Sequence, residues 1–457
     1  MSAIIAPSAA PESRAPIYLA PEIGDGQITR TVIRPLFARP GLGWWIGFLV
    51  SLAVTIVMLV SIGWLFIDGV GIWGINTTEV WGFAIANYVW WIGIGNAGTL
   101  ISSLLLLTRQ RWRSSINRFA ETMTLFAATI AGLFPILHLG RPYLFYWLVP
   151  YSNVMSLWPQ WRSPLVWDLF AIGSYIIFSA LFWYTGMLPD LATMRDRSRS
   201  RIARRIYGAF ALGWTGSARQ WREYETFYWA MAAIAVPLVV SVHSVVGLDF
   251  AAGLMPGWQE TIFPPYFVVG AMFSGFAMVI TLAIPIRAGM KLESLITLAH
   301  LDAMAKILLM GSVVMGLSYA SEWFVAWYAG ATADRTLLSF EFTGAYAPYY
   351  WALLLFNVGL PQLFWFPALR RSLVVLFGVA ILVNVGMWLE RMLIIINTLS
   401  RDFLPSQWGF YVPTIWDWLL LAGTLGFFCF MFFCFVRLLP IASMHELRQL
   451  AFEERKG

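Results

Sequence analysis

Ten long apolar runs constrain the fold of this chain more than any other feature of its sequence. A bilayer core requires about 20 apolar residues per spanning helix. The expected spans are Trp44–Ile67, Val80–Leu107, Phe119–His138, Pro164–Leu188, Thr226–Leu248, Ile262–Pro285, Ala303–Tyr328, Ala347–Pro367, Ser372–Ile396 and Ile415–Arg437. Of the 457 residues, 59% are hydrophobic and 12% are charged, whereas soluble domains carry about 25% charged residues. The sequence therefore predicts an all-α polytopic membrane protein, and it excludes a disordered chain.

The positions of the basic residues predict the topology of the chain. Of the 30 Lys and Arg residues, 24 fall in the two tails and in alternate connections, whereas four fall on the opposite side. Because cytoplasmic loops are enriched in Lys and Arg, we expect both termini to lie in the cytoplasm of a bacterium and the spans to cross its inner membrane. This bias also explains the net charge of +6. A nucleic-acid partner is not expected, because no stretch interleaves basic and aromatic residues on a water-exposed surface.

Titratable residues gather near the predicted outer ends of the spans. An ionisable group inside a bilayer costs about 2.5–3.5 kcal/mol on the insertion scale and usually marks function. The residues at this depth are His138, Arg141, Asp168, His243, Asp249, Glu322, Glu390 and Arg391. Each also has a structural interpretation, for example an ion pair between Asp168 and Arg391 or a helix end capped by His138. Their common depth favours a shared site.

Quinol oxidation fits this set of residues. A quinol needs hydrogen-bond partners for two hydroxyl groups, and a neutral His with a nearby carboxylate can take its protons. An Arg can orient a carboxylate or stabilise a developing anion. We therefore predict four catalytic residues, and we expect these four and two further residues to bind the quinol. The predicted catalytic residues are His138, Asp168, Asp249 and Arg391, and the two additional binding residues are Arg141 and His243.

Two other classes of protein remain open at this point. A b-type haem could use His138 and His243 as axial ligands. A secondary transporter could place its substrate near the bilayer midplane. The two cysteines, Cys429 and Cys434, lie together in one apolar run, and we expect no metal centre in this chain.

Further polar residues inside the spans are candidates for a proton path. One group is near the middle and inner part of the second span, and the other is in the seventh and ninth spans. These candidates are Asn96, Thr99, Ser102, Asp302, Lys306, Glu322 and Glu390. Lys306 could instead extend its side chain to the inner interface.

Five segments, in order along the chain, resemble the membrane subunits of polysulfide reductase, the NrfD (PsrC) family. They are WWIGIGNAGTLISSLL (90–105), FPILHLGRPYLFYW (134–147), SPLVWDLFAIGSY (163–175), SVHSVVGLDFAAG (241–253) and PPYFVVGAMFSGFAMV (264–279). The resemblance covers residues 80–400. More narrowly, these segments are similar to the quinol-oxidising NrfD-like subunits, ActC, of bacterial Alternative Complex III. Asn96 stands where relatives often carry His.

The resemblance implies two four-helix bundles, residues 80–260 and 261–400. The first and last spans would flank these bundles. The polar, Pro- and Ala-rich residues 1–43 are expected to form a cytoplasmic N-terminal tail, residues 44–79 the first helix and a periplasmic loop, and residues 401–457 the last helix and a cytoplasmic C-terminal tail. A menaquinol or ubiquinol site would lie near the periplasmic face of the first bundle, with His138, Asp168, Asp249 and Arg391 as its residues.

The resemblance also implies the surroundings of the chain. Electrons would pass to a periplasmic iron–sulfur protein and a multihaem cytochrome c of a respiratory or photosynthetic complex, beside a second NrfD-like subunit and membrane lipids. Proton translocation could accompany this transfer. Within the family, a non-catalytic sister subunit or a quinone-reducing member remains an alternative.

Overall fold

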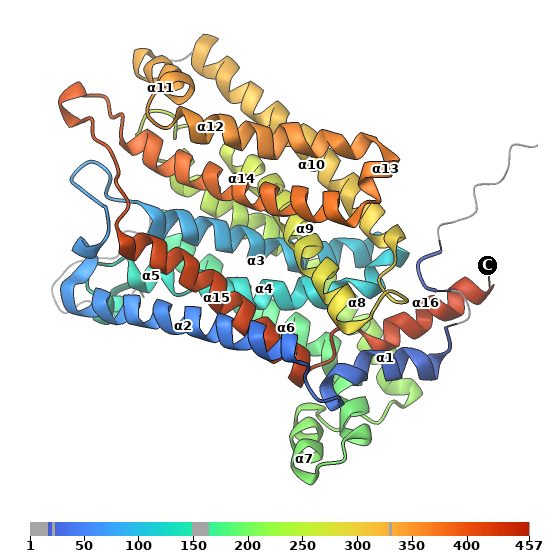
Figure 1. The fold of residues 1–457 in the computed structure, drawn as a ribbon. Helices are drawn as coiled ribbons and strands as arrows, with labels where there is room; N and C mark the ends of the chain where they lie inside the picture. The colour runs from blue at the N-terminus through green and yellow to red at the C-terminus, as the bar shows by residue number, and fades with distance from the viewer. Residues whose placement is uncertain (1–16, 21–22, 149–163, 329–330, 457) are drawn as a thin grey trace, which may run out of the picture.

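The computed structural model describes residues 17–20, 23–148, 164–328 and 331–456, and every regular element in these ranges is helical (Figure 1). Nine helices in the described ranges are long and apolar enough to cross a membrane. These nine spans are formed by α2 (Leu42–Asp68), α3 (Phe83–Leu107), α4 with α5 (Asn117–Ala131 and Phe134–Leu137), α6 (Pro164–Arg197), α8 (Ala218–Ala251), α9 (Phe263–Met290), α10 (Leu298–Tyr328), α14 (Leu373–Leu399) and α15 (Ile415–Leu438). The prediction of an all-helical polytopic membrane protein is confirmed.

The run predicted as the eighth span, Ala347–Pro367, is helical but interrupted. It consists of α12 (Ala347–Leu354), a π-helical turn η4 (Leu355–Gly359) and a 3-10 turn η5 (Leu360–Trp365). Pro361 has no N–H to donate to the carbonyl oxygen of Asn357, four residues earlier. The hydroxyl of Ser312 on α10 donates to that oxygen at 2.7 Å instead. The break therefore has a local cause and a partner on a neighbouring helix.

Helix α3 forms the interior of the molecule and α2 lies at its periphery. In the most apolar 18-residue window of each helix, 89% of α3 is buried but only 22% of α2. A Cβ on Gly98 of α3 would overlap the Ala120 carbonyl of α4, and a Cβ on Gly275 of α9 would overlap Ala97. Small residues thus let α4 and α9 approach α3 closely, as is common between membrane helices.

The helix contacts fall into two groups around α3 and α9. Helix α3 packs on α4 and α8, and α6 packs on both α4 and α8, whereas α9 packs on α10 and α14 and α14 packs on α12. Helix α9 also packs on α3 and α8, and α14 packs on α3. Helices α2 and α15 pack on each other. We propose to retain the division into bundles at residues 80–260 and 261–400, with α3 and α8 of the first bundle in contact with α9, and α3 also in contact with α14.

The first and the last helix of the described chain lie at the same end of the molecule, on the right in Figure 1. Helix α1 (Asp25–Phe37) packs on α16 (Met444–Lys456), and Arg455 pairs with Asp25 at 2.9 Å. The short amphipathic helix α7 (Arg201–Phe210) lies at this end too. The remaining short elements are η1 (Gly69–Ile72), η2 (Arg111–Ser115), η3 (Pro142–Leu148), α11 (Thr332–Thr343), α13 (Pro367–Arg370) and η6 (Pro405–Gln407).

Replacing Ser312 by Ala should destabilise the protein. The variant removes the donor that satisfies the Asn357 carbonyl in the buried π-helical turn, and an unsatisfied buried acceptor costs about 1–3 kcal/mol. Ser321→Ala on the same helix is the matched control, because the Ser321 hydroxyl donates only to the Leu317 carbonyl one turn earlier. Thermal unfolding of the two purified variants measures the difference, and equal Tm values would contradict this account of the interrupted helix.

Candidate functional site

A cavity of about 420 Å³ lies at the end of the helices opposite the termini. It is bounded by α3, by the α4–α5 bend and the following turn, and by α6 and α8. Three of its titratable lining residues within the described ranges, His138, Asp168 and Asp249, belong to the predicted catalytic set. These three come from segments up to 111 positions apart in the sequence, and the fold brings them to one space.

His138 lines this cavity, and one hydrogen bond defines which of its ring nitrogens carries the proton. Its Nδ1 lies 2.7 Å from the carbonyl oxygen of Phe134. Because a carbonyl oxygen can only accept a hydrogen bond, Nδ1 must carry the proton. In the neutral ring Nε2 is then left with a lone pair, which is the form of imidazole that accepts a proton from a hydroxyl group.

Asp168 and Asp249 meet at the cavity, together with a tyrosine that the sequence did not single out. The hydroxyl of Tyr88 on α3 donates to Asp168 Oδ2 at 2.8 Å. The carboxyl groups of Asp168 and Asp249 lie close enough to interact, and two carboxyl groups that share a site disfavour ionisation of both. Tyr88 gave no signal in the sequence, because an aromatic residue near Trp90 and Trp91 looks like ordinary packing in an apolar span.

The remaining cavity wall is apolar and aromatic. It comprises Trp81, Ile85, Val89, Gly132, Pro135, Ile136, Leu139, Phe145, Leu148, Leu169, Ile172, Gly173, Ile176 and Phe250. A few convergent polar groups in an apolar cavity are typical of a small-molecule site. The dimensions and lining suit a flat ring that carries hydroxyl groups and an apolar tail.

Arg391 lies away from this cavity, although it belongs to the predicted catalytic set. Its guanidinium pairs with Glu390 at 2.7 Å and lies 4.1 Å from the centre of the Phe267 ring. Arg141, at the outer surface, is exposed. Among the described residues, the cavity lining includes neither arginine. The structure therefore brings together His138, Asp168 and Asp249 but not the two arginines of the predicted set.

His243 and Asn96 form a separate buried pair in the interior of the first bundle. The Asn96 amide and His243 Nδ1 lie 2.7 Å apart, and both residues are almost fully buried. His243 does not contribute to the described lining of the cavity. Asn96 on α3 thus contacts a histidine on the adjacent helix α8.

Below this pair, polar side chains continue along α3 toward the end that carries the termini. Thr99 donates to Ser179 at 3.1 Å and Ser102 donates to Glu121 at 2.6 Å. Glu121 also accepts from Tyr228 at 2.8 Å and lies 3.6 Å from Arg118. Sequence reasoning missed Glu121. Glu121 could have been predicted as a buried polar residue, because it is an acidic residue within an apolar run.

Arg118, which immediately precedes the predicted third span, is buried. Its guanidinium pairs with Asp190 at 3.1 Å and donates to the Gly186 carbonyl. Its side chain is 1% exposed. This arginine therefore belongs to the internal polar network as well as to the basic side of the chain.

The candidates in the second bundle fall into two separate groups. Asp302 pairs with Lys306 at 2.8 Å and with Arg370 at 2.7 Å, so Lys306 has an acidic partner. Glu390 accepts from Tyr319, which also accepts a hydrogen bond from the Asn357 amide. Glu322 is close enough to Glu341 and Glu260 for electrostatic interaction.

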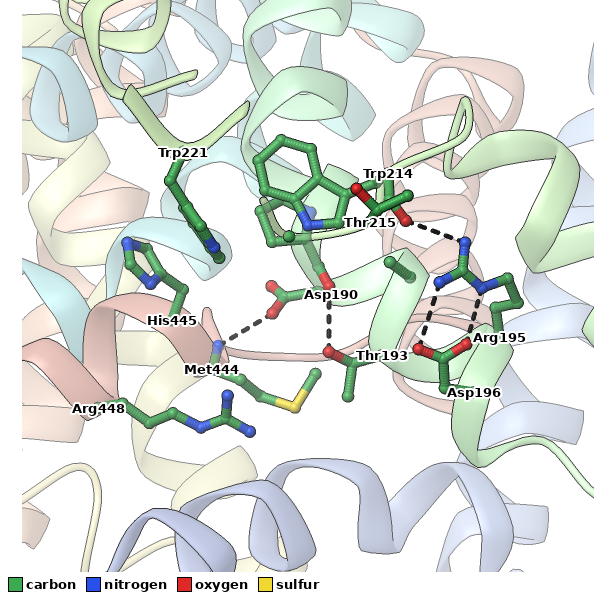
Figure 2. A pocket seen from close by; sticks show the side chains of 13 residues that line it. Asp190, Thr193, Arg195, Asp196, Trp214, Thr215, Trp221, Met444, His445 and Arg448 are labelled. Atoms are coloured by element: carbon green, nitrogen blue, oxygen red, sulfur yellow. Dashed lines mark hydrogen bonds and ion pairs between the residues drawn. The ribbon is translucent and has the colours of Figure 1, made fainter. Parts of the chain in front are cut away.

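A second pocket, of about 210 Å³, lies at the end of the molecule with the termini (Figure 2). Asp190 lines it and accepts from the backbone N–H of Met444, while Trp221 stacks on His445 with ring centres 4.0 Å apart. Asp168 and Asp190 are 22 residues apart on α6, which corresponds to about 33 Å along the helix. The two pockets are thus separated by roughly the thickness of a bilayer core.

No group of three or more His, Cys, Asp or Glu side chains in the described ranges could hold a metal ion.

Comparison with known proteins identifies the class of membrane protein to which this fold and cavity belong. The family described as "Polysulphide reductase, NrfD" matches residues 73–401. This chain is a member of the NrfD family.

Two curated relatives share part of the chain. A putative membrane subunit of dimethyl sulfoxide reductase from Halobacterium salinarum is 26% identical over 275 residues, 57% of this chain and 55% of the relative. A subunit of selenate reductase from Mesobacillus selenatarsenatis is 22% identical over 243 residues, 51% of this chain and 55% of the relative. The chain spans about half the length of the curated relatives that it matches.

Replacing Glu446 by Gln should loosen the C-terminal helix from the bundle. Glu446 pairs with Arg113 at 2.9 Å and accepts from Asn117, and the side chains of the ion pair are only 13% and 6% exposed. Removing one partner of a buried ion pair costs about 3–5 kcal/mol, because the other charge remains buried.

The matched control for this change is Glu453→Gln on the same helix. Glu453 meets Arg111 at 4.0 Å and both side chains are partly exposed, so the expected cost is at most about 1 kcal/mol. Thermal unfolding of the purified variants checks the difference. A Tm for Glu446→Gln no lower than that of Glu453→Gln would contradict a stabilising role for the Arg113–Glu446 pair.

Proposed function

We propose that this chain is the quinol-oxidising membrane subunit of an oxidoreductase complex. The observation that carries the proposal is the cavity in which His138, Asp168 and Asp249 meet among apolar and aromatic side chains. Family membership supports the class, since the names of both relatives describe subunits of reductases. The substrate, its binding site and the direction of electron flow are parts of this proposal.

The geometry suggests how a quinol would lose its protons. One hydroxyl donates to Nε2 of His138, the ring nitrogen left without a proton by the Phe134 hydrogen bond. The other donates to Asp168, and Asp249 takes that proton onward through the contact between the two carboxyl groups. Oxidation releases two protons and two electrons, and the electrons pass to an iron–sulfur centre of a partner subunit.

Tyr88 acts as a positioning residue in this scheme. Its hydroxyl donates to Asp168 Oδ2 and so restrains the position of the carboxyl group. Arg391 keeps a proposed role only through Glu390, the carboxylate that it contacts. His243 and Arg141 likewise would act outside the cavity.

We further propose the arrangement typical of Alternative Complex III. The substrate would be menaquinol, the cavity would face the periplasm, and both termini would lie in the cytoplasm. The acceptors would be a periplasmic iron–sulfur protein and a multihaem cytochrome c, beside a second NrfD-like subunit. The buried polar chain through Asn96, Thr99 and Ser102 supports coupling to proton translocation.

A second candidate is the quinol-oxidising subunit of a terminal reductase. The names of the two relatives, which describe parts of a dimethyl sulfoxide reductase and a selenate reductase, favour it. The acceptor distinguishes the two candidates: the first complex reduces cytochrome c and the second reduces a small oxidised substrate. The haem alternative is less well supported, because an axial pair must face one space and the described cavity lining includes His138 but not His243.

Replacing His138 by Ala or Asp168 by Asn should reduce quinol-dependent reduction of the electron acceptor by at least about 100-fold, the usual contribution of a general base. His445→Ala and Asp402→Asn are the matched controls, because neither lies at the cavity. Turnover by the purified complex measures the effect, and gel electrophoresis of that complex checks that all of its polypeptides have assembled. Normal turnover in both cavity variants would refute the site.

Replacing Tyr88 by Phe should lower kcat/KM for the quinol by about 10-fold, since a hydrogen bond to a charged group is worth about 1.5–3 kcal/mol. The ring is retained, so packing in α3 is preserved. Tyr184→Phe, whose hydroxyl donates to the Phe210 carbonyl at the protein surface, is the control. A Tyr88→Phe enzyme with unchanged kcat/KM would show that the tyrosine does not position Asp168.

A further inference from the structure

Two adjoining cavities lie between α2, α9 and α15, at the end of the molecule with the termini. The larger, of about 550 Å³, is lined by apolar residues of all three helices, such as Leu282, Ile286 and Phe433. The smaller, of about 190 Å³, is lined by Arg34, Arg39, Lys291 and Arg437. Gly41, Trp44, Gly289 and Met290 line both. The two cavities therefore form one surface that is apolar at one end and basic at the other.

The change from apolar to basic coincides with the ends of the spans. Helix α2 begins at Leu42, α9 ends at Met290 and α15 ends at Leu438. The apolar part thus lies alongside the membrane-spanning residues, and the basic part lies at the interface. Trp44 stands at the boundary, where Trp is enriched in membrane proteins.

The positive charges of the smaller cavity lack acidic partners. No ion pair involves Arg34, Arg39, Lys291 or Arg437 within the described part of the chain, and the lining has no acidic residue. The Arg437 guanidinium donates to the carbonyl oxygens of Pro35 and Ala38 and lies 5.8 Å from the centre of the Trp44 ring. Arg437 fixes the turn between α1 and α2, while Arg39 and Lys291 remain exposed.

We propose that these cavities together bind one anionic phospholipid of the leaflet on this side. The phosphate would lie on Arg39 and Lys291, and the acyl chains would follow the apolar groove between α9 and α15. Basic pockets between membrane helices recognise anionic headgroups in this manner. A transmembrane helix from another subunit would fill the groove but would leave the cluster of positive charges without a partner, so charge complementarity favours the lipid.

Gly289 keeps the groove open where its two parts join. A Cβ added at this position meets no atom within 4 Å. A phenylalanine there would fill the groove without displacing neighbouring atoms. Gly378 on α14 also has open space around its Cβ position and lies outside the groove, so it offers a matched control.

Native mass spectrometry of the delipidated complex containing this chain tests the proposal. Phosphatidylglycerol should bind at one tight site, and phosphatidylcholine with the same acyl chains should bind more weakly. The double variant Arg39→Gln/Lys291→Gln should weaken phosphatidylglycerol binding by about 10-fold or more. The control Arg201→Gln/Arg205→Gln, which removes the same charge from exposed residues of α7, should not.

A separate pair of variants tests the apolar half of the site. Gly289→Phe should weaken binding of both lipids, whereas Gly378→Phe should leave it unchanged. Equal binding of the two lipids, or equal effects of the site and control variants, would overturn the proposal. So would a photo-crosslinker at position 43 that captures another subunit of the intact complex in place of lipid.

Discussion

Polar groups buried between membrane helices must find partners within the protein, because the bilayer core offers none. The interior of this protein follows that constraint along α3, whose polar residues contact side chains of α4, α6 and α8. Asn96 meets His243, Thr99 meets Ser179, Ser102 meets Glu121 and Tyr88 meets Asp168. These pairings fix the rotation of the three helices about α3, and thereby determine which side chains reach the cavity.

The sequence was sufficient to predict the helical class and nearly all of the spans, since each reads locally as a long apolar run. The interruption at η4 and η5 was not predicted. Its cause, Pro361 beside Gly359, is visible in the sequence, but the hydroxyl that stabilises the break belongs to Ser312, 45 residues before Asn357. A local pattern cannot identify that partner, so an interrupted span and a continuous one looked alike.

The sequence predicts how deep each residue of the candidate site lies in the membrane, but not which neighbours its side chain contacts. His138, Asp168 and Asp249 have similar predicted depths along the spans and line one cavity. Depth carries no information about the direction in which a side chain points around its helix. Arg391 and His243 share that depth and face other neighbours. Tyr88 was not predicted, because its proposed role depends on one hydrogen bond to Asp168. In an apolar run rich in aromatic residues, the sequence does not distinguish this tyrosine from a packing residue.

The central claim is that the quinol head binds between His138 and Asp168. Locating the density of a bound quinone or quinol analogue in an electron cryomicroscopy map of the purified complex tests it most directly. The account predicts a ring in the cavity of the first bundle, with one oxygen at hydrogen-bonding distance from His138 Nε2 and the other near the Asp168 carboxyl group. A quinone ring located elsewhere, with this cavity filled by side chains or lipid, would contradict it.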